Sequence, residues 1–285
     1  MTIKTNLNLF ICLICSCVFF ASPVFAGSYA PQAGEEGSTA IRFNRSDIFV
    51  DWATGCEVVR GPVDISDPGQ GYASYGTADQ ALGISGNNVY GVVSLGDGGY
   101  ATLTFDAPII NGEGYDFAVF ENGFTIQENP DVDPEWWNTD FLELAFVEVS
   151  SDGENFFRFD AVSETQTDHQ VQGIDATEIH NFASKYTLGW GTPFDLEELV
   201  GISGLDLNDI THVRVMDVVG SLDDAYAGYD SLGNKINDPW RTAGWTGGFD
   251  LDAIGVINQA PIPGAVWLLG SGLIALAGLR RRYKT

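Results

Sequence analysis

The feature that most constrains the fold is a succession of short aromatic and β-branched runs, separated by turns rich in Gly, Asn and Asp. Alternation of apolar and polar residues with a period of two is typical of strands that bury one face. Turn signals such as 96–99, 111–114 and 151–153 lie between the runs. The runs that we predict to be strands are 48–52, 89–95, 100–105, 115–120, 142–149, 156–159, 211–218 and 249–257.

Helical periodicity is brief in this chain, at 176–184 and 195–200 only. Eight or more short strands without long alternating helices favour an all-β, jelly-roll-like β-sandwich. Residues 27–260 are numerous enough for one such domain, because sandwiches often run long.

Both ends of the chain carry apolar segments that predict export. Lys4, the apolar stretch 7–20 and the small residues around Val24-Phe25-Ala26 form a signal peptide over 1–26, with Gly27 as the expected first residue after cleavage. The uncharged run 262–279 is long enough for a single C-terminal transmembrane helix. The arginines at 280–282 that follow it would stay on the cytoplasmic side, so the body would lie outside.

The tail 261–285 also carries a recognisable motif. Pro261, Pro263 and Ala265 precede the apolar run and the triple Arg280, Arg281 and Arg282. This arrangement resembles the PEP-CTERM class of bacterial sorting signals. The resemblance implies cleavage near the motif by a membrane peptidase of the exosortase type, release to the cell surface and an association with exopolysaccharide. The Glu of Pro-Glu-Pro is absent and Gly264 stands next to Pro263, which leaves the scissile bond open. The alternative is a plain inner-membrane anchor.

The body is strongly acidic once these end segments are set apart. It holds all 39 Asp and Glu residues but only eight of the 13 Lys and Arg residues, a net charge of −31. Such a field repels nucleic acid and anionic lipid surfaces. It favours divalent cations, or simply keeps a surface protein soluble.

Cysteine and histidine usage excludes several classes of site. Cys56 is the one cysteine outside the predicted signal peptide, so the body can form no internal disulfide. Its three histidines lack the spacings typical of zinc hydrolases. No Gly-x-Ser-x-Gly motif or P-loop lysine is present, and no carboxylate pair stands out. We therefore predict that the protein is not an enzyme.

Two parts of the body resemble carbohydrate-binding folds. The sequence 147–156, a strand, an Asp-Gly turn and an aromatic strand, is similar to a hairpin of galactose-binding-like jelly rolls of the discoidin group. The segment 248–256 resembles the last strand of related carbohydrate-binding modules, where an Asp often ligates structural calcium. Segments 116–124, 191–196, 230–239 and 247–252 look like parts of bacterial surface proteins that carry this tail, without implying a ligand.

Acidic and amide side chains recur at short intervals around Gly233. Oxygen ligands with this spacing allow a loop to wrap a hard cation, although the pattern departs from an EF-hand. Asp250 and Asp252 alternate with Phe249 and Leu251, which places both carboxylates on one strand face. The candidate calcium ligands are Asp217, Asp223, Asp224, Asp230, Asn234, Asp238, Asp250 and Asp252. The alternative is a flexible acidic loop beside two solvent-facing strand residues.

A second candidate site is the acidic and aromatic loop 121–137. Glu121, Asn122, Trp136 and Trp137 combine aromatic faces with polar groups, as sugar-binding grooves do. The alternative, which we favour, is that the two tryptophans cap one end of the core.

Three functional hypotheses remain from the sequence. The leading one is an exported surface or matrix protein that acts by binding or structure and is stabilised by calcium. The second is a calcium-dependent carbohydrate-binding module that uses the Trp136-Trp137 loop. The third is a secreted glycan-degrading enzyme. The expected partners are an exosortase-type peptidase, the inner membrane through the C-terminal helix, and exopolysaccharide.

Overall fold

The computed structural model describes residues 27–242 and 244–261, and within them the chain is all-β. The strands are short except for β5, β14 and β15, and no α-helix occurs in these ranges. The strands are β1 (Ile41–Arg42), β2 (Asp51–Trp52), β3 (Gly55–Val59), β4 (Val93–Ser94), β5 (Tyr100–Ile109), β6 (Phe117–Glu121), β7 (Phe124–Thr125), β8 (Asp140–Phe141), β9 (Ala145–Ser150), β10 (Phe157–Arg158), β11 (Val162–Ser163), β12 (Ile179–His180), β13 (Trp190–Phe194), β14 (Ile210–Asp217) and β15 (Asp250–Val256). Short 3-10 turns are η1 (Pro68–Gln70), η2 (Ala78–Ala81), η3 (Pro134–Trp136), η4 (Ala176–Glu178), η5 (Leu196–Leu199) and η6 (Gly244–Thr246).

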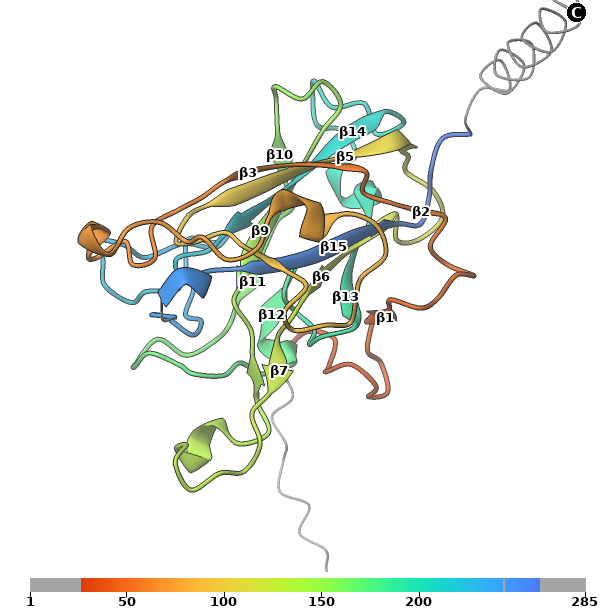
Figure 1. Ribbon diagram of the computed structural model, residues 1–285. Helices are drawn as coiled ribbons and strands as arrows, with labels where there is room; N and C mark the ends of the chain where they lie inside the picture. The colour runs from red at the N-terminus through yellow and green to blue at the C-terminus, as the bar shows by residue number, and fades with distance from the viewer. Residues whose placement is uncertain (1–26, 243, 262–285) are drawn as a thin grey trace, which may run out of the picture.

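Two antiparallel sheets form the body in a sandwich-like arrangement (Figure 1). One sheet has the order β10-β9-β14-β5-β3. The other has the order β1-β13-β6-β15-β2, with β4 also paired to β15. Neighbouring strands in these sheets are often far apart in sequence, as β15 and β6 are, so the fold depends on long-range pairing.

The main core lies between the sheets because alternate residues of their central strands point inward. Leu103 of β5 and Val213 of β14 are Cα partners and are both fully buried. Phe117 of β6 and Ile254 of β15 belong to the same cluster from the opposite sheet. This alternation is the period-two pattern that predicts half-buried strands.

Each of the eight predicted runs contains a strand of the structure, although 48–52, 89–95 and 156–159 contribute only two strand residues each. The strand β13 is missing from the prediction because Gly191 and Pro193 interrupt its apolar pattern. Pro193 is tolerated since β1 pairs only with Gly191 and Trp190, which leaves the chain at Pro193 bonded to β6 alone.

The two predicted helical segments are corrected by the structure. Residues 176–184 form η4 followed by β12, and residues 195–200 form η5. Asp175 and Asp195 each accept a hydrogen bond from the backbone two residues ahead, at 2.9 Å in both cases. This local bonding favours a single turn and gives it a helix-like start without a continuing helix.

The predicted hairpin at 147–156 is present. Val149 of β9 pairs with Phe157 of β10, and the connecting loop closes on Asp152, whose Oδ1 accepts from the amides of Glu154 and Asn155 at 2.8 Å each. The loop is therefore an Asp-centred turn, as the Asp-Gly signal indicates.

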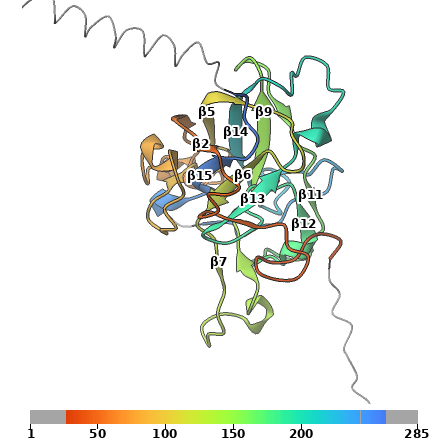
Figure 2. The same ribbon diagram turned by 90° about the vertical axis from the view of Figure 1, so that its right-hand side faces the viewer.

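A second, smaller core lies beside the sandwich. The hairpins β7–β8 and β11–β12 border it, and it includes Leu142, Leu144, Ile174 and Phe182. The loop between β7 and β8 projects from the body in both ribbon views, at the bottom of Figures 1 and 2.

Neither predicted end segment falls within the described residues. The signal peptide 1–26 and the apolar run 262–279 both lie outside them. In the part that is described, no helix has the length and hydropathy needed to cross a membrane.

Candidate functional site

Two surface depressions lie where the β7–β8 hairpin meets residues 239–242 and Thr246. Two adjoining hollows of about 470 and 480 Å³ share Phe124, Phe141, Arg241 and Thr242 in their walls. We call them the first and second hollow, and together the cleft. The first hollow is also lined by Ile126, Val132, Gln170, Val171, Gln172, Pro239 and Trp240, and the second by Val89, Asn122, Glu143, Thr246 and Asp250.

An aromatic pair forms the shared wall of the cleft. Phe124 and Phe141 are cross-strand partners, with ring centroids 5.0 Å apart and ring planes at 9°. The Phe124 ring is 54% exposed, so part of a flat apolar face meets solvent. Thr125 donates to Asp140 Oδ1 at 2.7 Å across the same hairpin, which supports the stacked geometry.

Fixed polar groups surround this aromatic face. Asn122 donates through Nδ2 to Val89 O at 3.0 Å and to Asp250 Oδ2 at 3.1 Å. Arg241 forms an ion pair with Asp64, Nε to Oδ2 at 3.2 Å. These groups are already oriented by protein contacts, which lowers the entropic cost of using them to bind a ligand.

The first hollow is anchored through Gln170. Its side-chain amide nitrogen, Nε2, donates to Gly220 O at 2.7 Å, Asn237 Oδ1 at 2.9 Å and Asp238 O at 2.6 Å. The loop that carries Gln170 is therefore fixed to the segment 237–238.

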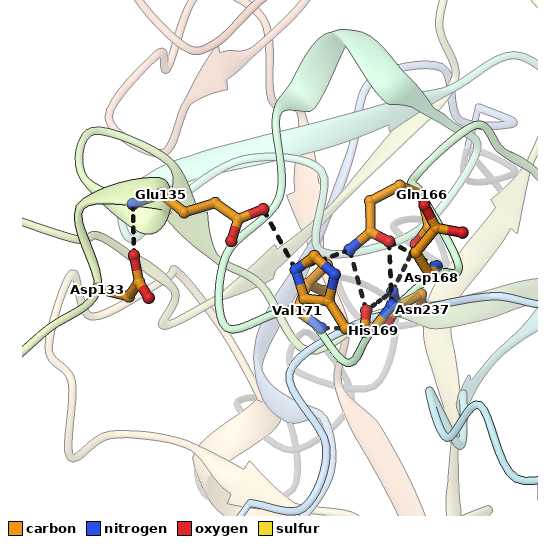
Figure 3. A network of polar contacts seen from close by, with 7 residues as sticks. All are labelled: Asp133, Glu135, Gln166, Asp168, His169, Val171 and Asn237. Carbon is orange, nitrogen blue, oxygen red and sulfur yellow. Dashed lines mark hydrogen bonds and ion pairs between the residues drawn. The ribbon is translucent and has the colours of Figure 1, made fainter.

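Figure 3 shows how the neighbouring loops are held together. Asn237 donates to His169 O at 2.9 Å and accepts from the Val171 amide at 3.2 Å. Nε2 of His169 in turn lies 3.2 Å from Oε1 of Glu135, which belongs to η3 in the projecting loop. Contacts at the half-exposed His169 thus connect the projecting loop to the wall of the first hollow.

The structure does not bring the four residues predicted to bind a sugar to one surface depression. Trp136 is 8% exposed and belongs to the smaller core, and Trp137 is half-buried with Nε1 donating to Val132 O at 3.2 Å. Neither tryptophan lines the cleft. Glu121 is buried, with Oε2 accepting from Ser184 Oγ at 2.9 Å, and only Asn122 reaches the second hollow.

In the predicted calcium-binding loop 223–238, the Asp side chains bond mainly to backbone amides of the same loop. The carboxylate of Asp230 accepts from the amides of Leu232 and Asn234 at 2.9 and 2.8 Å. Asp223 Oδ1 accepts from the Ala225 amide at 3.0 Å, and Asp224 pairs with Lys235 at 2.5 Å. These groups are satisfied separately and do not converge on one point.

Asp250 and Asp252 are buried, against the alternative that they face solvent. Asp252 accepts from Ser85 Oγ and from the Gly86 amide, while Asp250 accepts from Ser94 and Asn122. The segment 85–94 therefore covers this face of β15. Burial raises the pKa of Asp250 to about 6.

Asp217 and Asp238 do come together, with two residues that the sequence did not single out. They line a cavity of about 10 Å³ with Asp97 and Glu143, and we call it the carboxylate cavity. It adjoins the cleft, because Glu143 and Thr242 also line the second hollow. Burial raises the pKa of all four carboxyl groups, and Asp250 adds to the shift at Glu143.

Weak local signals mark Asp97 and Glu143, the two carboxylates that the sequence analysis did not select. Asp97 lies in a Gly-rich turn, and Gly96 and Gly98 have φ of 77° and 68°, so the turn needs glycine for its conformation. Glu143 lies between Leu142 and Leu144 in a strand-like run, where an acidic residue is unusual.

The four carboxylates of the cavity do not form a metal centre in their present arrangement. Within 27–242 and 244–261, no three Asp, Glu, His or Cys side chains have an arrangement that could hold a metal ion. Of the predicted sorting residues, Pro261 is exposed, and Pro263, Gly264, Ala265 and Arg280–Arg282 lie outside these ranges.

Comparison with known proteins gives no further assignment: no family model and no curated protein matches this sequence.

Proposed function

We propose that this protein is an exported surface- or matrix-associated β-sandwich that binds a polysaccharide segment in the cleft. The observation that carries the proposal is the stacked Phe124–Phe141 pair, whose partly exposed ring lies between two polar-rimmed hollows. Sugar rings present apolar C–H faces and hydroxyl edges, and a flat aromatic ring with nearby hydrogen-bonding groups complements both.

The size and charge of the cleft support a neutral polymer as the ligand. Each hollow has a volume typical of a small-ligand site, and two adjoining hollows offer room for more than one sugar ring. The net charge of −31 on the body repels nucleic acids and strongly anionic polymers. Neutral hydroxyl-rich chains are not penalised by this field.

We also propose that the two sheets form a jelly roll of the galactose-binding-like type. Two antiparallel sheets around one core and the β9–β10 hairpin are compatible with the galactose-binding-like jelly roll. Architecture of this kind is shared by proteins with different ligands, so the cleft and not the fold supports carbohydrate binding.

Export and sorting are supported by the sequence at both ends of the chain. The signal-peptide pattern in 1–26 and the tail motif with Pro261, Pro263 and Ala265 favour delivery through the inner membrane and processing by an exosortase-type peptidase. A surface location would bring the cleft into contact with exopolysaccharide.

Binding is tested with exopolysaccharide from the native host, together with a panel of neutral glycans on an array. Phe124→Ala should weaken binding at least tenfold, about 1.4 kcal/mol. Trp245→Ala is the matched control, because Trp245 is 68% exposed but lines neither hollow. Equal affinities for Phe124→Ala and the unmutated protein, or no binding to any polymer, would refute the proposal.

One observation favours a second candidate, hydrolysis of a glycosidic bond. Glu143 and Asp250 both line the second hollow, and burial raises the pKa of both. A pair of carboxyl groups with one protonated is the arrangement that glycoside hydrolysis uses. Release of new reducing ends from the polymer, lost in Asp250→Asn, would support hydrolysis, whereas binding without product would support the binding protein.

A further inference from the structure

Four carboxylates from distant parts of the chain meet at the carboxylate cavity. Asp97 follows β4, Glu143 lies between β8 and β9, Asp217 ends β14, and Asp238 precedes the wall of the first hollow. Up to 141 positions separate them in sequence, so only the folded chain brings them together.

The four carboxylate side chains of the cavity are all buried. Asp97, Glu143, Asp217 and Asp238 are 4, 6, 4 and 3% exposed. None of the ion pairs among the described residues includes any of them. Concentrating buried carboxylates is costly unless they are protonated or bound to positive charge.

One buried oxygen of these four carboxylates has no hydrogen-bond partner among the described residues. Glu143 Oε1 is buried and has no hydrogen-bond partner in the described part of the chain. By contrast, Asp217 accepts from Gly98 and Phe249 through its two oxygens, at 2.8 and 2.6 Å. A buried acceptor without a donor costs free energy, so an ion or proton at Glu143 stabilises the fold.

Backbone contacts hold the other carboxylates in place. Asp97 Oδ2 accepts from the Ile65 amide at 2.8 Å and from Trp240 Nε1 at 3.1 Å, and Asp238 Oδ2 accepts from the Leu144 amide at 2.9 Å. Gly220 permits the position of Asp238, because a Cβ there would lie 1.7 Å from Oδ1. These carboxylates keep further lone pairs for a cation.

We propose that Asp97, Glu143, Asp217 and Asp238 bind one divalent cation of the calcium type in the carboxylate cavity. The donors are all oxygens, which suit calcium and not zinc or copper. The cavity of about 10 Å³ has room for one water-sized body. Since the oxygens do not converge as they stand, binding requires rotation of Glu143, whose Oε1 has no partner, toward the three carboxylates that backbone contacts hold in place. This proposal does not rest on polysaccharide binding.

The position of the carboxylate cavity between the two sheets predicts that a bound cation stabilises the fold. Asp217 ends β14 of one sheet, and its Oδ1 bonds the amide that precedes β15 of the other. A cation that also engages Glu143 and Asp238 would cross-link both sheets to the base of the cleft. Binding to the folded form alone raises its stability by mass action.

Terbium luminescence provides a direct test on the full-length protein in mild detergent. Trp240 lines the same cavity, so excitation of its indole should sensitise emission from Tb³⁺ bound there. Added Ca²⁺ should displace Tb³⁺ and quench the emission, and matched NaCl should not. Trp240→Phe should lose most of the sensitised emission, while calorimetry should still detect Ca²⁺ binding.

Conservative variants locate the site. Glu143→Gln and Asp238→Asn should each weaken Ca²⁺ binding at least tenfold by calorimetry. Asp223→Asn removes the same charge from an exposed position outside the cavity and should leave the affinity within twofold. A circular dichroism spectrum like that of the unmutated protein shows that each variant is folded.

If a variant does not fold, the melting temperature of the unmutated protein still tests whether Ca²⁺ binds specifically. A melting temperature that rises no more with millimolar Ca²⁺ than with NaCl of equal ionic strength would overturn the proposal. So would Ca²⁺ binding of equal strength in Asp223→Asn, Glu143→Gln and Asp238→Asn, because the cation would then bind elsewhere. Failure of glycan binding with retained Ca²⁺ binding would refute only the proposed function.

Discussion

Asp217 Oδ1 accepts a hydrogen bond from the Phe249 amide at 2.6 Å, which fastens the end of β14 to the start of β15. The other oxygen of Asp217 accepts from the Gly98 amide at 2.8 Å. One side chain therefore satisfies two backbone donors and links a Gly-rich turn with both sheets. The close approach uses Gly248, where a Cβ would lie 2.7 Å from Asp217 Oδ1.

Removing this link should destabilise the fold even when no divalent cation is present. Asp217→Ala leaves two backbone amides without their acceptor, and each buried unsatisfied group costs about 1–3 kcal/mol. We expect a loss of roughly 2–5 kcal/mol in the free energy of unfolding, measured by urea denaturation in excess chelator.

Asp209→Ala is the control for this loss, because Asp209 is exposed just before β14. Its effect should stay within about 0.5 kcal/mol. A similar small effect for Asp217→Ala would mean that water replaces the carboxylate and that the two sheets do not depend on it.

Glu121 predicts a pH dependence of stability. Burial and the nearby Asp250 raise the pKa of Glu121 to about 8 from 4.5. The folded state therefore holds a proton that the unfolded state releases above about pH 4.5, so this group lowers the free energy of unfolding as pH rises toward 8. The decrease should amount to a few kcal/mol and level off above about pH 8.

Glu121→Gln tests this dependence, because its amide oxygen can still accept from Ser184 and from Gly123. The variant should be more stable than the unmutated protein at pH 7 and show a flatter profile from pH 5 to 8 in chelator. Glu113→Gln, an exposed change of the same kind, should leave the profile unchanged. Parallel profiles for all three proteins would show that Glu121 is ionised in the fold.

Variants of the two tryptophans in the projecting loop test whether these residues stabilise the fold or bind a glycan. Trp136→Ala should lower the free energy of unfolding by about 3–5 kcal/mol, since its ring is packed in the smaller core. Trp137→Ala should cost less, because Trp137 is only half-buried. Glycan affinity, measured where both variants are folded, should change little; a tenfold loss in Trp137→Ala alone would restore the loop as the binding site.

The sequence predicts the strands better than it predicts the site, and particular residues explain why. The runs at 100–105 and 211–218 carry their own periodicity, so β5 and β14 follow from local pattern. Trp136 also takes the core position that we favoured from the sequence. β13 contains Gly191 and Pro193, and its place depends on β1 and β6, which no local pattern reveals.

The candidate site depends even more on long-range packing. Asp217 and Asp238 were selected because acidic residues cluster around them, yet Asp223, Asp224 and Asp230 in the same region bond elsewhere. Asp97 lies in a Gly-rich turn and Glu143 lies between β8 and β9, and both are far in sequence from the acidic region. Local spacing therefore identifies an acidic region, and only the tertiary fold selects which carboxylates share a cavity.

Cys56 should behave as an unreactive thiol. Burial raises its pKa to about 11 from 9, so the thiolate fraction at pH 7.5 falls about a hundredfold. Alkylation by iodoacetamide should be slower by a comparable factor in the folded protein than in urea. The measurement uses a variant with Ser at positions 12, 15 and 17, so that Cys56 is the one thiol; equal rates in both states would contradict the prediction.

Cleavage within the C-terminal tail 261–285 would determine the mass of the protein found at the cell surface. If an exosortase-type peptidase processes it, protein released from the surface of the native host should end near Pro263–Ala265, and intact-mass measurement would place the end within a few residues. Replacing Arg280–Arg282 with Ser removes the positive charge that holds the C-terminal end in the cytoplasm, so the precursor should be retained less well in the membrane. Replacing Lys235 and Arg241 with Ser removes positive charge from the body instead and should not change retention. A surface form that still carries Thr285 would show that the segment is an anchor and that the proposed processing does not occur.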